Sequence, residues 1–371
     1  MQILRAIAGK EARTRAELAR YLKLAPSTVS ARVQELLANG ELIEVGISSS
    51  QGGRPPTVLR TAQEAFRYLV VSLGSVHVRL GIVLGSGEIE GVEEHPVDVR
   101  NSPEETLQNL TPLLQSLMES TNERGGVQAV CVAVPGPVDV KAQSIVHPSR
   151  LPGWNNFPVA KWLNEQLKVP VVAENDANLM ALGEHIQHPE LASTITVKAG
   201  TGIGAGMIID GKCYRGATGM GGDLSHARLP GAPDIPCACG NTGCLEAIAS
   251  GQALVDQMRQ QGHAVTGVSD IVAMATDAEP SATLAVREAG RTLGLMLCPI
   301  AEFTNPEAIF LGGQLSTLEA YVASVRSQLY DGCHPLVTRD LVIAPTTAGP
   351  DAILIGAAHL LMGEYFHMIT L

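Results

Sequence analysis

Four side chains with the chemistry of metal ligands lie close together in the second half of the chain. His226, Cys237, Cys239 and Cys244 supply one imidazole and three thiols, and the cysteines fall within the ten residues "CACGNTGCLE". Zinc binds three thiolates and one imidazole in a closed tetrahedron, which leaves no position open for catalysis. Two glycines inside this short stretch allow it to curl until the sulfurs converge. The spacing predicts one structural zinc ion; the alternatives are a redox pair and a chance cluster.

A second group of polar residues interrupts an apolar stretch. "ENDAN", at residues 174–178, follows the buried strand pattern "VPVVA", where polar side chains are costly unless they face a cleft. Asp176 can act there as a general base toward a sugar hydroxyl, with Asn175 holding the neighbouring hydroxyl. The alternative is a helix N-cap, a position that Asp and Asn also favour. Further along the chain, "GMGGDLSH" places Asp223 and His226 ahead of the cysteines.

A glycine-rich turn, "GTGIGAG" at residues 200–206, joins two apolar segments. The backbone N–H groups of such a turn can approach an anion without obstruction from side chains. A tight hairpin between two core strands would have the same composition. The sequence leaves both interpretations open.

The elements that must position these groups follow a repeated order. From residue 68, "YLVVSLGS", "VHVRLGIVLG" and "EIEGVEEHPV" predict three antiparallel strands separated by Gly/Ser turns. Two helices, at about 103–123 and 158–168, then alternate with buried strands, and a second strand–turn–strand pattern begins at Thr194. The order βββαβαβ and this weak self-similarity predict an α/β fold of two actin-like lobes around a cleft. We expect the first lobe at 62–180, with a C-terminal helix at 352–371 packed on it. We expect the second lobe at 181–351, including the zinc loop.

The first sixty residues have a different character. Three short helical patterns are followed by "ELIEVGISSSQGGRPPTVLR", which alternates strand, loop and strand. Two helices joined by a short turn form the helix-turn-helix plan, and the hairpin matches a wing. The residues that we expect to face DNA are Ser27, Thr28, Ala31 and Gln34 on the second of these two helices, with Arg32 on phosphate and Arg54 in the minor groove. The alternative is a three-helix oligomerisation module.

The charge distribution supports a DNA-binding segment on an acidic body. The whole chain of 371 residues carries a net charge of −11. Nine Lys/Arg and five Glu give residues 1–60 a charge of +4, so the remainder carries −15. A local attractive field on a soluble bulk is what a DNA-binding regulator needs, whereas the overall charge argues against a protein coated with nucleic acid.

Composition also bears on the compartment. No apolar stretch approaches the ~20 residues that span a bilayer, and the N-terminal residues lack the apolar core of a signal peptide. We therefore expect a cytoplasmic protein. Cys131, Cys213, Cys298 and Cys333 are scattered singly, so we interpret them as packed thiols and not as a disulfide framework.

Several motifs together resemble the ROK family of repressors, open reading frames and kinases. The motifs are "LPGWNNFP", "VPVVAENDANLMALGE", "GTGIGAGMIIDGKCYRGATGMGGDLSH", "CACGNTGCLEAIASG" and "IFLGGQLS", in that order. With the predicted winged helix in front, the chain is similar to the xylose-, N-acetylglucosamine- and glucose-responsive regulators of that family. The resemblance implies the ribonuclease H-like sugar-kinase fold for the body. It also implies sugar contacts at Asn175, Asp176, Asp223, His226 and Glu246, with weaker ones at Asn156 and Gly136.

Kinase members of the family begin with an Asp-x-Gly-Gly-Thr phosphate loop, from which this chain departs. Its stretch is "SLGSV", so that Ser72 replaces the Asp, Ser75 the second Gly and Val76 the Thr. A hydroxyl is a poor substitute for a carboxylate beside Mg²⁺, and valine removes a phosphate donor. The family's Glu-x-Gly-His is here Asp223-Leu-Ser225-His226, with a shorter acid that can select a different sugar.

The sequence thus predicts a sugar-responsive DNA-binding regulator, most simply a repressor, in which kinase activity is lost and Asp176 is a vestigial base. We expect a homodimer or homotetramer, a double-stranded operator, a sugar or amino-sugar effector and no membrane partner. One alternative is an ATP-dependent sugar kinase with an attached DNA-binding domain. Another is an interaction protein in which the body and the zinc serve only dimerisation.

Overall fold

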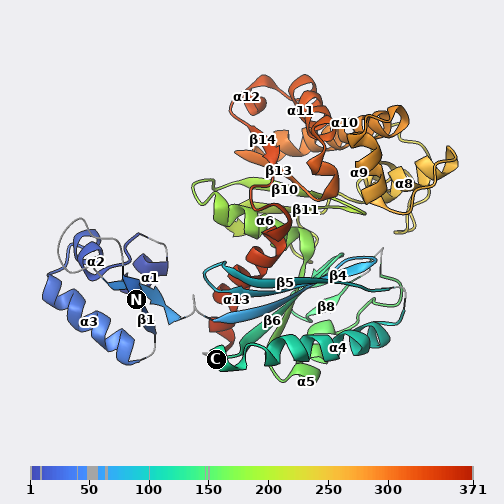
Figure 1. Cartoon of the computed structure of the whole chain (residues 1–371). Coiled ribbons are helices and arrows are strands. Elements are labelled where there is room, and N and C mark those ends of the chain that lie inside the picture. Colours follow the sequence, from blue (N-terminus) through green and yellow to red (C-terminus); the bar gives the residue numbers. More distant parts are fainter. Residues whose placement is uncertain are drawn as a thin grey trace.

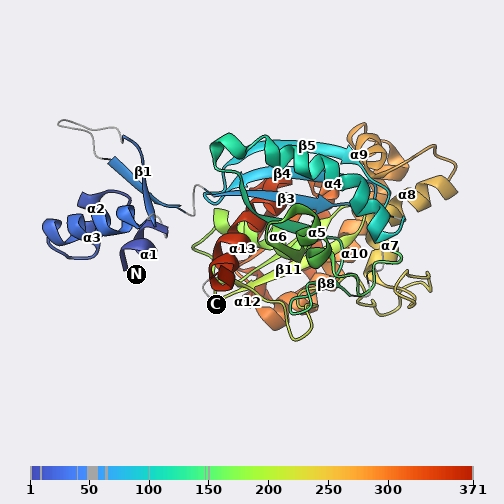
Figure 2. The ribbon, with the colours of Figure 1, turned by 90° about the horizontal axis from the view of Figure 1, so that it is seen from below.

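A computed structural model of the chain describes residues 2–8, 11–39, 41–47, 57–62, 66–99, 101–146, 148 and 151–369. The chain forms a small N-terminal unit and a larger body of two lobes (Figure 1). Viewed from below, the N-terminal unit lies to one side of the body, and the end of the last helix lies on the same side (Figure 2). None of the described helices combines the length and the apolar run that a membrane crossing requires.

The N-terminal unit contains the predicted helices and hairpin and has a hydrophobic core of its own, built around Ile7, Leu18, Val33 and Leu59. A capping box between Thr14 and Glu17 fixes the start of its second helix, because each residue binds the backbone of the other. The elements are α1 (Gln2–Ala8), α2 (Arg15–Tyr21), α3 (Pro26–Ala38), β1 (Leu42–Ile47) and β2 (Thr57–Thr61), with the two strands antiparallel.

The first lobe is a five-stranded sheet covered on both faces. The order is β5-β4-β3-β6-β9, in which β3, β4 and β5 are antiparallel and β6 and β9 are parallel to β3. Helices α4 and α5 cover one face, and α6 and α13 cover the other. The bounds are β3 (Arg67–Leu73), β4 (His77–Leu84), β5 (Ile89–Pro96), α4 (Pro103–Glu119), η2 (Asn122–Arg124), β6 (Val127–Val134), β7 (Val138–Asp139), β8 (Ser144–Ile145), α5 (Val159–Leu167), β9 (Val171–Asn175), α6 (Asp176–Gln187) and α13 (Ala352–Ile369).

The second lobe repeats this topology, as the sequence predicted. Its sheet has the order β12-β11-β10-β13-β14, again with three antiparallel strands followed by two parallel ones. The bounds are β10 (Thr194–Ala199), β11 (Ile203–Ile209), β12 (Lys212–Cys213), α7 (Leu245–Ala249), α8 (Gly251–Gln260), α9 (Val268–Thr276), α10 (Pro280–Thr304), β13 (Ala308–Gly312), η3 (Gln314–Thr317), α11 (Glu319–Gly332), α12 (Pro335–Thr338), β14 (Val342–Pro345) and η4 (Gly349–Asp351).

The expectation that Cys298 and Cys333 are packed thiols outside any disulfide is confirmed, but the sequence did not indicate that the two lie against each other. Helices α10 and α11 pack closely along each other and bring the two Sγ atoms to 2.7 Å, although 35 residues separate them in sequence. Both remain free cysteines. Burial, followed by the contact with Cys298, raises the pKa of Cys333 to about 12, so this thiol stays protonated at neutral pH.

Helices α6 and α13 cross at van der Waals distance through two glycines. A Cβ on Gly183 would lie 1.9 Å from the carbonyl oxygen of Ala352, and a Cβ on Gly356 would lie 1.9 Å from that of Leu179. Because backbone atoms cannot move aside as a side chain does, no larger residue fits at either position. This crossing attaches the C-terminal helix to the first lobe, as the sequence suggested, and fixes the helix that connects the two lobes.

We predict that Gly356→Ala lowers the free energy of unfolding by about 3 kcal/mol or more, because the added methyl group must push α13 away from α6. Gly363→Ala on the same helix is the matched control: its Cβ would meet nothing within 4 Å, so the better helix propensity of Ala should stabilise by up to about 1 kcal/mol. Urea unfolding measures both. Equal effects of the two substitutions would contradict the close crossing.

Candidate functional site in the cleft between the lobes

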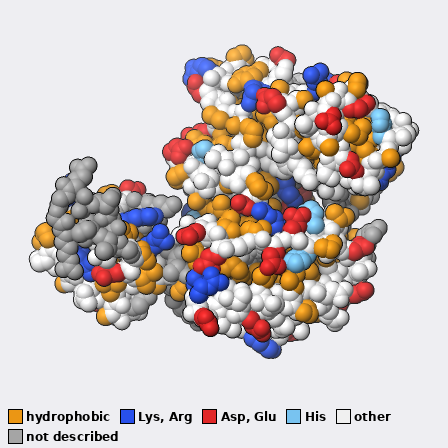
Figure 3. Space-filling model, in the orientation of Figure 1, with side chains coloured by type: hydrophobic (Ala, Val, Ile, Leu, Met, Phe, Trp, Pro, Cys, Tyr) orange, Lys and Arg blue, Asp and Glu red, His pale blue; other side chains and the backbone are white. Residues whose placement is uncertain are grey.

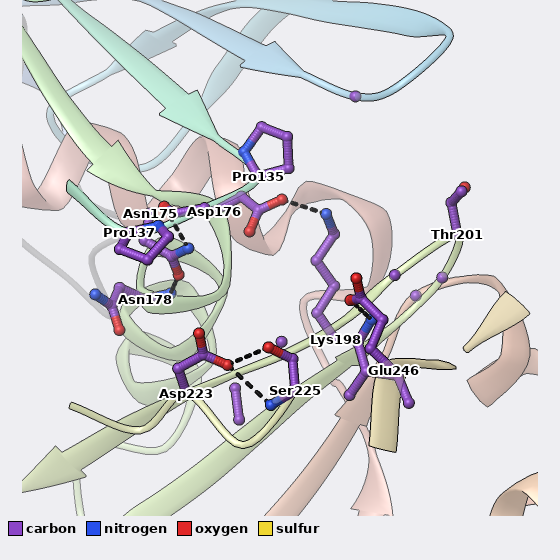
Figure 4. Close-up of a pocket in the computed structure, with 18 of the residues that line it drawn as sticks. Pro135, Pro137, Asn175, Asp176, Asn178, Lys198, Thr201, Asp223, Ser225 and Glu246 are labelled. Atoms are coloured by element: carbon purple, nitrogen blue, oxygen red, sulfur yellow. Dashed lines mark hydrogen bonds and ion pairs between the residues drawn. The ribbon is translucent and has the colours of Figure 1, made fainter. Parts of the chain in front are cut away.

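A polar cavity of about 220 Å³ lies between the two lobes. Its lining comes from the β3–β4 turn, the junction of β9 with α6, the β10–β11 turn, the loop at residues 219–226 and the start of α7. We call it the interlobe cavity. Figure 3 shows the hollow between the lobes, and Figure 4 shows the side chains that converge on it from both. The predicted residues Gly136, Asn175, Asp176, Asp223, His226 and Glu246 all line it.

Asp176 has a positively charged partner in this cavity. It begins α6, is only 5% exposed, and forms an ion pair with Lys198 on β10 (Figure 4). A buried carboxylate is costly without a partner, and the lysine supplies one. Sequence reasoning missed Lys198, although a charged residue inside the apolar strand "TITVKA" was a signal that something must pair with it.

Asn175 is the N-cap of α6, as the alternative interpretation of the "ENDAN" segment predicted. Its Oδ1 accepts hydrogen bonds from the backbone N–H groups of Ala177 (3.0 Å) and Asn178 (3.1 Å). Its Nδ2 donates to the carbonyl oxygen of Gly136 at 2.9 Å. The same side chain lines the interlobe cavity, so capping and ligand contact are compatible at this position.

A buried ion pair behind Asp176 was also missed by the sequence analysis. Glu174, at the end of β9, is almost fully buried and accepts hydrogen bonds from Arg215 Nε at 2.6 Å and from Asn178 Nδ2 at 3.0 Å. Glu174 therefore stabilises the wall of the cavity, because its hydrogen bonds connect β9 and α6 to the loop that follows β12.

Asp223 is held by the serine that departs from the family pattern. One of its carboxylate oxygens accepts from Ser225 N at 2.9 Å and from Ser225 Oγ at 2.5 Å (Figure 4). The hydroxyl exists only because residue 225 is not glycine. Asp223 is thus shorter than the family's Glu and is also restrained toward its own loop, which reduces its reach toward a ligand.

Glu246 and His226 complete the polar wall on the side of the second lobe. Glu246 is buried at the start of α7, and its Oε2 accepts from Ile203 N at 3.1 Å. His226 turns Nδ1 toward Cys237 Sγ, 3.5 Å away, while its side chain also lines the cavity. This residue therefore connects the cysteine cluster with the cavity.

Asn156, by contrast, is exposed and lies outside the lining of the interlobe cavity. It sits in the left-handed region with φ 60°, and its N–H donates to Ile145 O at 2.7 Å. A sugar contact from Asn156 stays a prediction.

The glycine-rich turn has a structural role. Residues 200–202 connect the antiparallel strands β10 and β11, which is the hairpin alternative. A Cβ on Gly206 would lie 2.6 Å from Ala177 O, so this glycine allows β11 to approach the start of α6. Gly200 and Thr201 still line the cavity.

In the β3–β4 turn, Ser75 lines the cavity, whereas Val76 is 67% exposed and offers no hydrogen-bond donor from its side chain.

The cysteine cluster is compact enough to hold a metal ion. The ligand atoms of His226, Cys237, Cys239 and Cys244 all lie within 4.8 Å of one another, and Cys239 Sγ is 3.6 Å from Cys244 Sγ. Zn–S bonds of 2.3 Å in a tetrahedron place sulfurs roughly 3.8 Å apart, so the set fits a metal ion. Burial, followed by the neighbouring thiols of Cys239 and Cys237, raises the pKa of Cys244 to about 12. A bound cation would favour the deprotonated form of Cys244.

The residues expected to contact DNA lie on the exposed side of α3. Ser27, Thr28, Ala31, Arg32 and Gln34 are all exposed, whereas Val29 and Val33 are buried in the core of the unit. Arg32 NH1 lies 3.1 Å from Glu35 Oε2, so its guanidinium is paired in the free protein. Arg54 lies outside the described residues.

Comparison with known proteins agrees with this geometry. The model of the ROK family matches residues 68–364. A xylose repressor from Bacillus spizizenii is 27% identical over 369 residues, which cover 96% of this chain and 93% of the repressor. A solved ROK family transcriptional regulator, a homologue of the Escherichia coli MLC protein, superposes with a TM-score of 0.78 at 23% identity and covers 98% of this chain and 94% of its own. A ROK glucokinase from Streptomyces griseus in complex with glucose and AMPPNP gives a TM-score of 0.68 at 26% identity and covers 79% and 98%. The chain belongs to the ROK family.

Proposed function

We propose that this protein is a DNA-binding transcriptional regulator, most simply a repressor of genes for carbohydrate uptake or catabolism, whose interlobe cavity binds a sugar or amino-sugar effector. The observation that carries the proposal is the N-terminal unit: it has its own core and presents a helix whose outer side is small and polar. The similarity to the xylose repressor extends over this unit, whereas the glucokinase match covers 79% of the chain. We expect the protein to act in the cytoplasm.

We divide the chain into a winged helix-turn-helix domain at 1–61, a first lobe at 62–180 with the C-terminal helix at 352–371, and a second lobe at 181–351. Hydrophobic clusters support this division in part, because the N-terminal unit, one face of the first-lobe sheet and the core of the second lobe are buried in three different ones. A fourth cluster, around α6 and α13, joins the other face of the first-lobe sheet to Ile208 of the second lobe. Helix α6 crosses the boundary at 180, and α13 packs against it.

In the proposed complex, α3 lies in the major groove and the β1–β2 hairpin forms the wing. Gln34 contacts a base edge, and Arg32 leaves Glu35 to contact a phosphate. Two such units on a dimer would bind half-sites one helical turn apart, ~34 Å. The oligomer is a homodimer or a homotetramer.

One zinc ion would be held by four ligands, His226, Cys237, Cys239 and Cys244. A closed set of four protein ligands gives the ion a structural task. It would join the loop that carries His226 to the loop that precedes α7, and so place His226 and Glu246 beside the cavity.

The interlobe cavity suits a polyhydroxylated ligand better than phosphoryl transfer. Asn175, Asp176, Glu246 and His226 offer the mixture of donors and acceptors that hydroxyl groups require. A kinase would need Asp176 as a general base, but Lys198 holds this carboxylate in an ion pair. Neither Ser72 nor Val76 supplies the charge or the donor that Mg-ATP requires. Effector binding would change the relative populations of lobe arrangements and thereby the spacing of the DNA-binding units.

The second candidate function is an ATP-dependent sugar kinase with an attached DNA-binding domain. Asp176 at the start of α6 and the glycine-rich turn that lines the cavity favour it. Release of ADP in the presence of a sugar would distinguish it from the regulator.

We predict that Gln34→Ala weakens binding to the operator by about 1–3 kcal/mol and relaxes the preference for one base pair, and that Arg32→Ala weakens binding to all sequences and lowers the salt slope by about 1. Fluorescence anisotropy on a duplex selected by the full-length protein measures both at several salt concentrations. The control is Arg291→Ala on α10, since Arg291 forms an equivalent exposed pair with Glu288 at 3.2 Å. Unchanged DNA binding in both α3 variants would contradict the assignment of α3.

We predict that the purified protein contains about one zinc per chain and that Cys244→Ser loses it, because three remaining ligands bind zinc far more weakly. Elemental analysis by mass spectrometry gives the stoichiometry, and thermal unfolding should show a lower Tm for the variant. Cys213→Ser changes a cysteine outside the cluster and should retain the metal. A wild-type protein that contains no metal and is insensitive to chelators would refute the site.

We predict that one neutral sugar raises the Tm by mass action, by an amount equivalent to about 2.7 kcal/mol at 100-fold its Kd, and that Mg-ATP neither adds to this shift nor yields ADP. The same sugar should alter operator affinity at fixed salt. An epimer of the active sugar is the control for specificity. Sugar binding without any change in operator affinity would rule out the sensor, and sugar-dependent ADP release would establish the kinase.

A further inference from the structure

A second and larger cavity, of about 780 Å³, lies next to the interlobe cavity. We call it the side cavity. Ser75, Thr201 and Glu246 line both cavities, so the two volumes meet at these three residues. The loop that carries Cys237 forms one wall of the side cavity, and helix α8 forms another. A ligand seated between the lobes can therefore extend past Glu246 toward α8.

Polar side chains follow one side of α8 along the side cavity. Gln252, Asp256, Gln257 and Gln260 line it, and the last three are exposed. The last lies eight positions after the first, which corresponds to about 12 Å along the helix. Amide and carboxylate groups together donate and accept hydrogen bonds, as a row of hydroxyl groups requires. The lining is thus longer than a single sugar ring needs.

Apolar side chains come from the other walls. Val76 is 67% exposed, and Ile235 is 41% exposed, and both line the side cavity. Exposed apolar groups opposite a row of amides match a sugar ring, which has C–H groups on its faces and hydroxyl groups at its edge. Burial of these two side chains by a ligand would also remove apolar surface from water.

The charge of the side cavity selects a neutral ligand. Glu246 and Asp256 contribute carboxylates, and among the described residues that line it there is no Lys, Arg or His. Arg259 pairs with Asp256 at 3.7 Å but does not line the cavity, so a nucleotide or a sugar phosphate would meet two carboxylates and no cation in the lining. In the interlobe cavity Lys198 is already paired with Asp176. The lining therefore disfavours anionic ligands in both cavities.

We propose that the effector is a neutral disaccharide or longer oligosaccharide, with one unit in the interlobe cavity and the next in the side cavity against α8. This inference rests on the proposed sugar-sensing function and names the ligand class of that site. Gln257 and Gln260 bind hydroxyl groups of the second unit, and Val76 and Ile235 contact its face. The zinc-binding loop then contributes to both subsites, through His226 in the first and through the segment around Cys237 in the second.

The test is isothermal titration calorimetry of the zinc-loaded full chain with matched series: xylose, xylobiose and xylotriose; glucose, cellobiose and maltose; N-acetylglucosamine and chitobiose. In one series the disaccharide is expected to bind at least 10-fold more tightly than its monosaccharide. Gln257→Ala and Gln260→Ala should each remove several-fold of this advantage while the monosaccharide affinity stays within twofold. Gln261→Ala, an exposed neighbour outside the side cavity, is the matched control. Both variants replace exposed side chains, so we expect them to fold, and circular dichroism is the check.

The outcomes separate the inference from the function on which it rests. A monosaccharide that binds as tightly as the longer sugars of its series, or glutamine variants that lose both ligands equally, would overturn the side cavity as a subsite and leave sugar sensing intact. If no sugar of any length binds, the sensing function itself fails and the subsite with it. Tight binding of a sugar phosphate or of Mg-ATP that competes with the disaccharide would overturn the neutral ligand class.

Discussion

The close crossing of α6 and α13 is the constraint on which the other features of the body depend. Gly183 and Gly356 bring the two backbones into direct contact, and Gly206 lets β11 approach the first turn of α6. Helix α6 is therefore held by the first lobe on one side and by the second lobe on the other. Because Asn175 caps this helix and Asp176 begins it, the position of both polar groups in the cavity follows from backbone contacts.

The acids of the interlobe cavity already have partners before a ligand arrives. Lys198 neutralises Asp176, Ser225 restrains Asp223, and the backbone of Ile203 binds Glu246. A ligand must therefore match a preorganised set of dipoles and cannot rely on a single strong charge. Such a site discriminates by the geometry of hydroxyl groups, because each buried polar group left without a partner costs free energy. This property suits a sensor, for which selectivity matters and chemical reactivity does not.

Coupling between effector and DNA would have to pass through the arrangement of the two lobes. The residues that line the interlobe cavity come from both lobes, so a ligand bound there would stabilise one relative position of the lobes over the others. The end of α13 lies on the side of the body that carries the N-terminal unit (Figures 1 and 2). A shift of the lobes that moves α13 would therefore occur on the side of the N-terminal unit, for which we propose DNA binding. The coupling is reciprocal, so operator binding must change effector affinity by the same factor.

The sequence by itself determined the features that are local along the chain. The four candidate metal ligands lie within nineteen positions of one another, and the capping box of α2 joins residues three positions apart. Glycine turns mark the strands of the repeated βββαβαβ order. Loss of the phosphate loop could also be predicted, because it depends on the identities of Ser72, Ser75 and Val76 and not on their surroundings.

Only the tertiary structure decided which distant residues meet. The partner of Asp176 comes from β10, and Arg215, which neutralises Glu174, comes from a loop 41 residues away. The contact of Cys298 with Cys333 exists because α10 packs against α11, and no spacing rule connects the two cysteines. The side cavity likewise requires the β3–β4 turn, the loop that carries Cys237 and α8 to be in place together. Periodicity and spacing describe neighbours within a segment, whereas long-range contacts depend on how the segments pack, which no local pattern specifies.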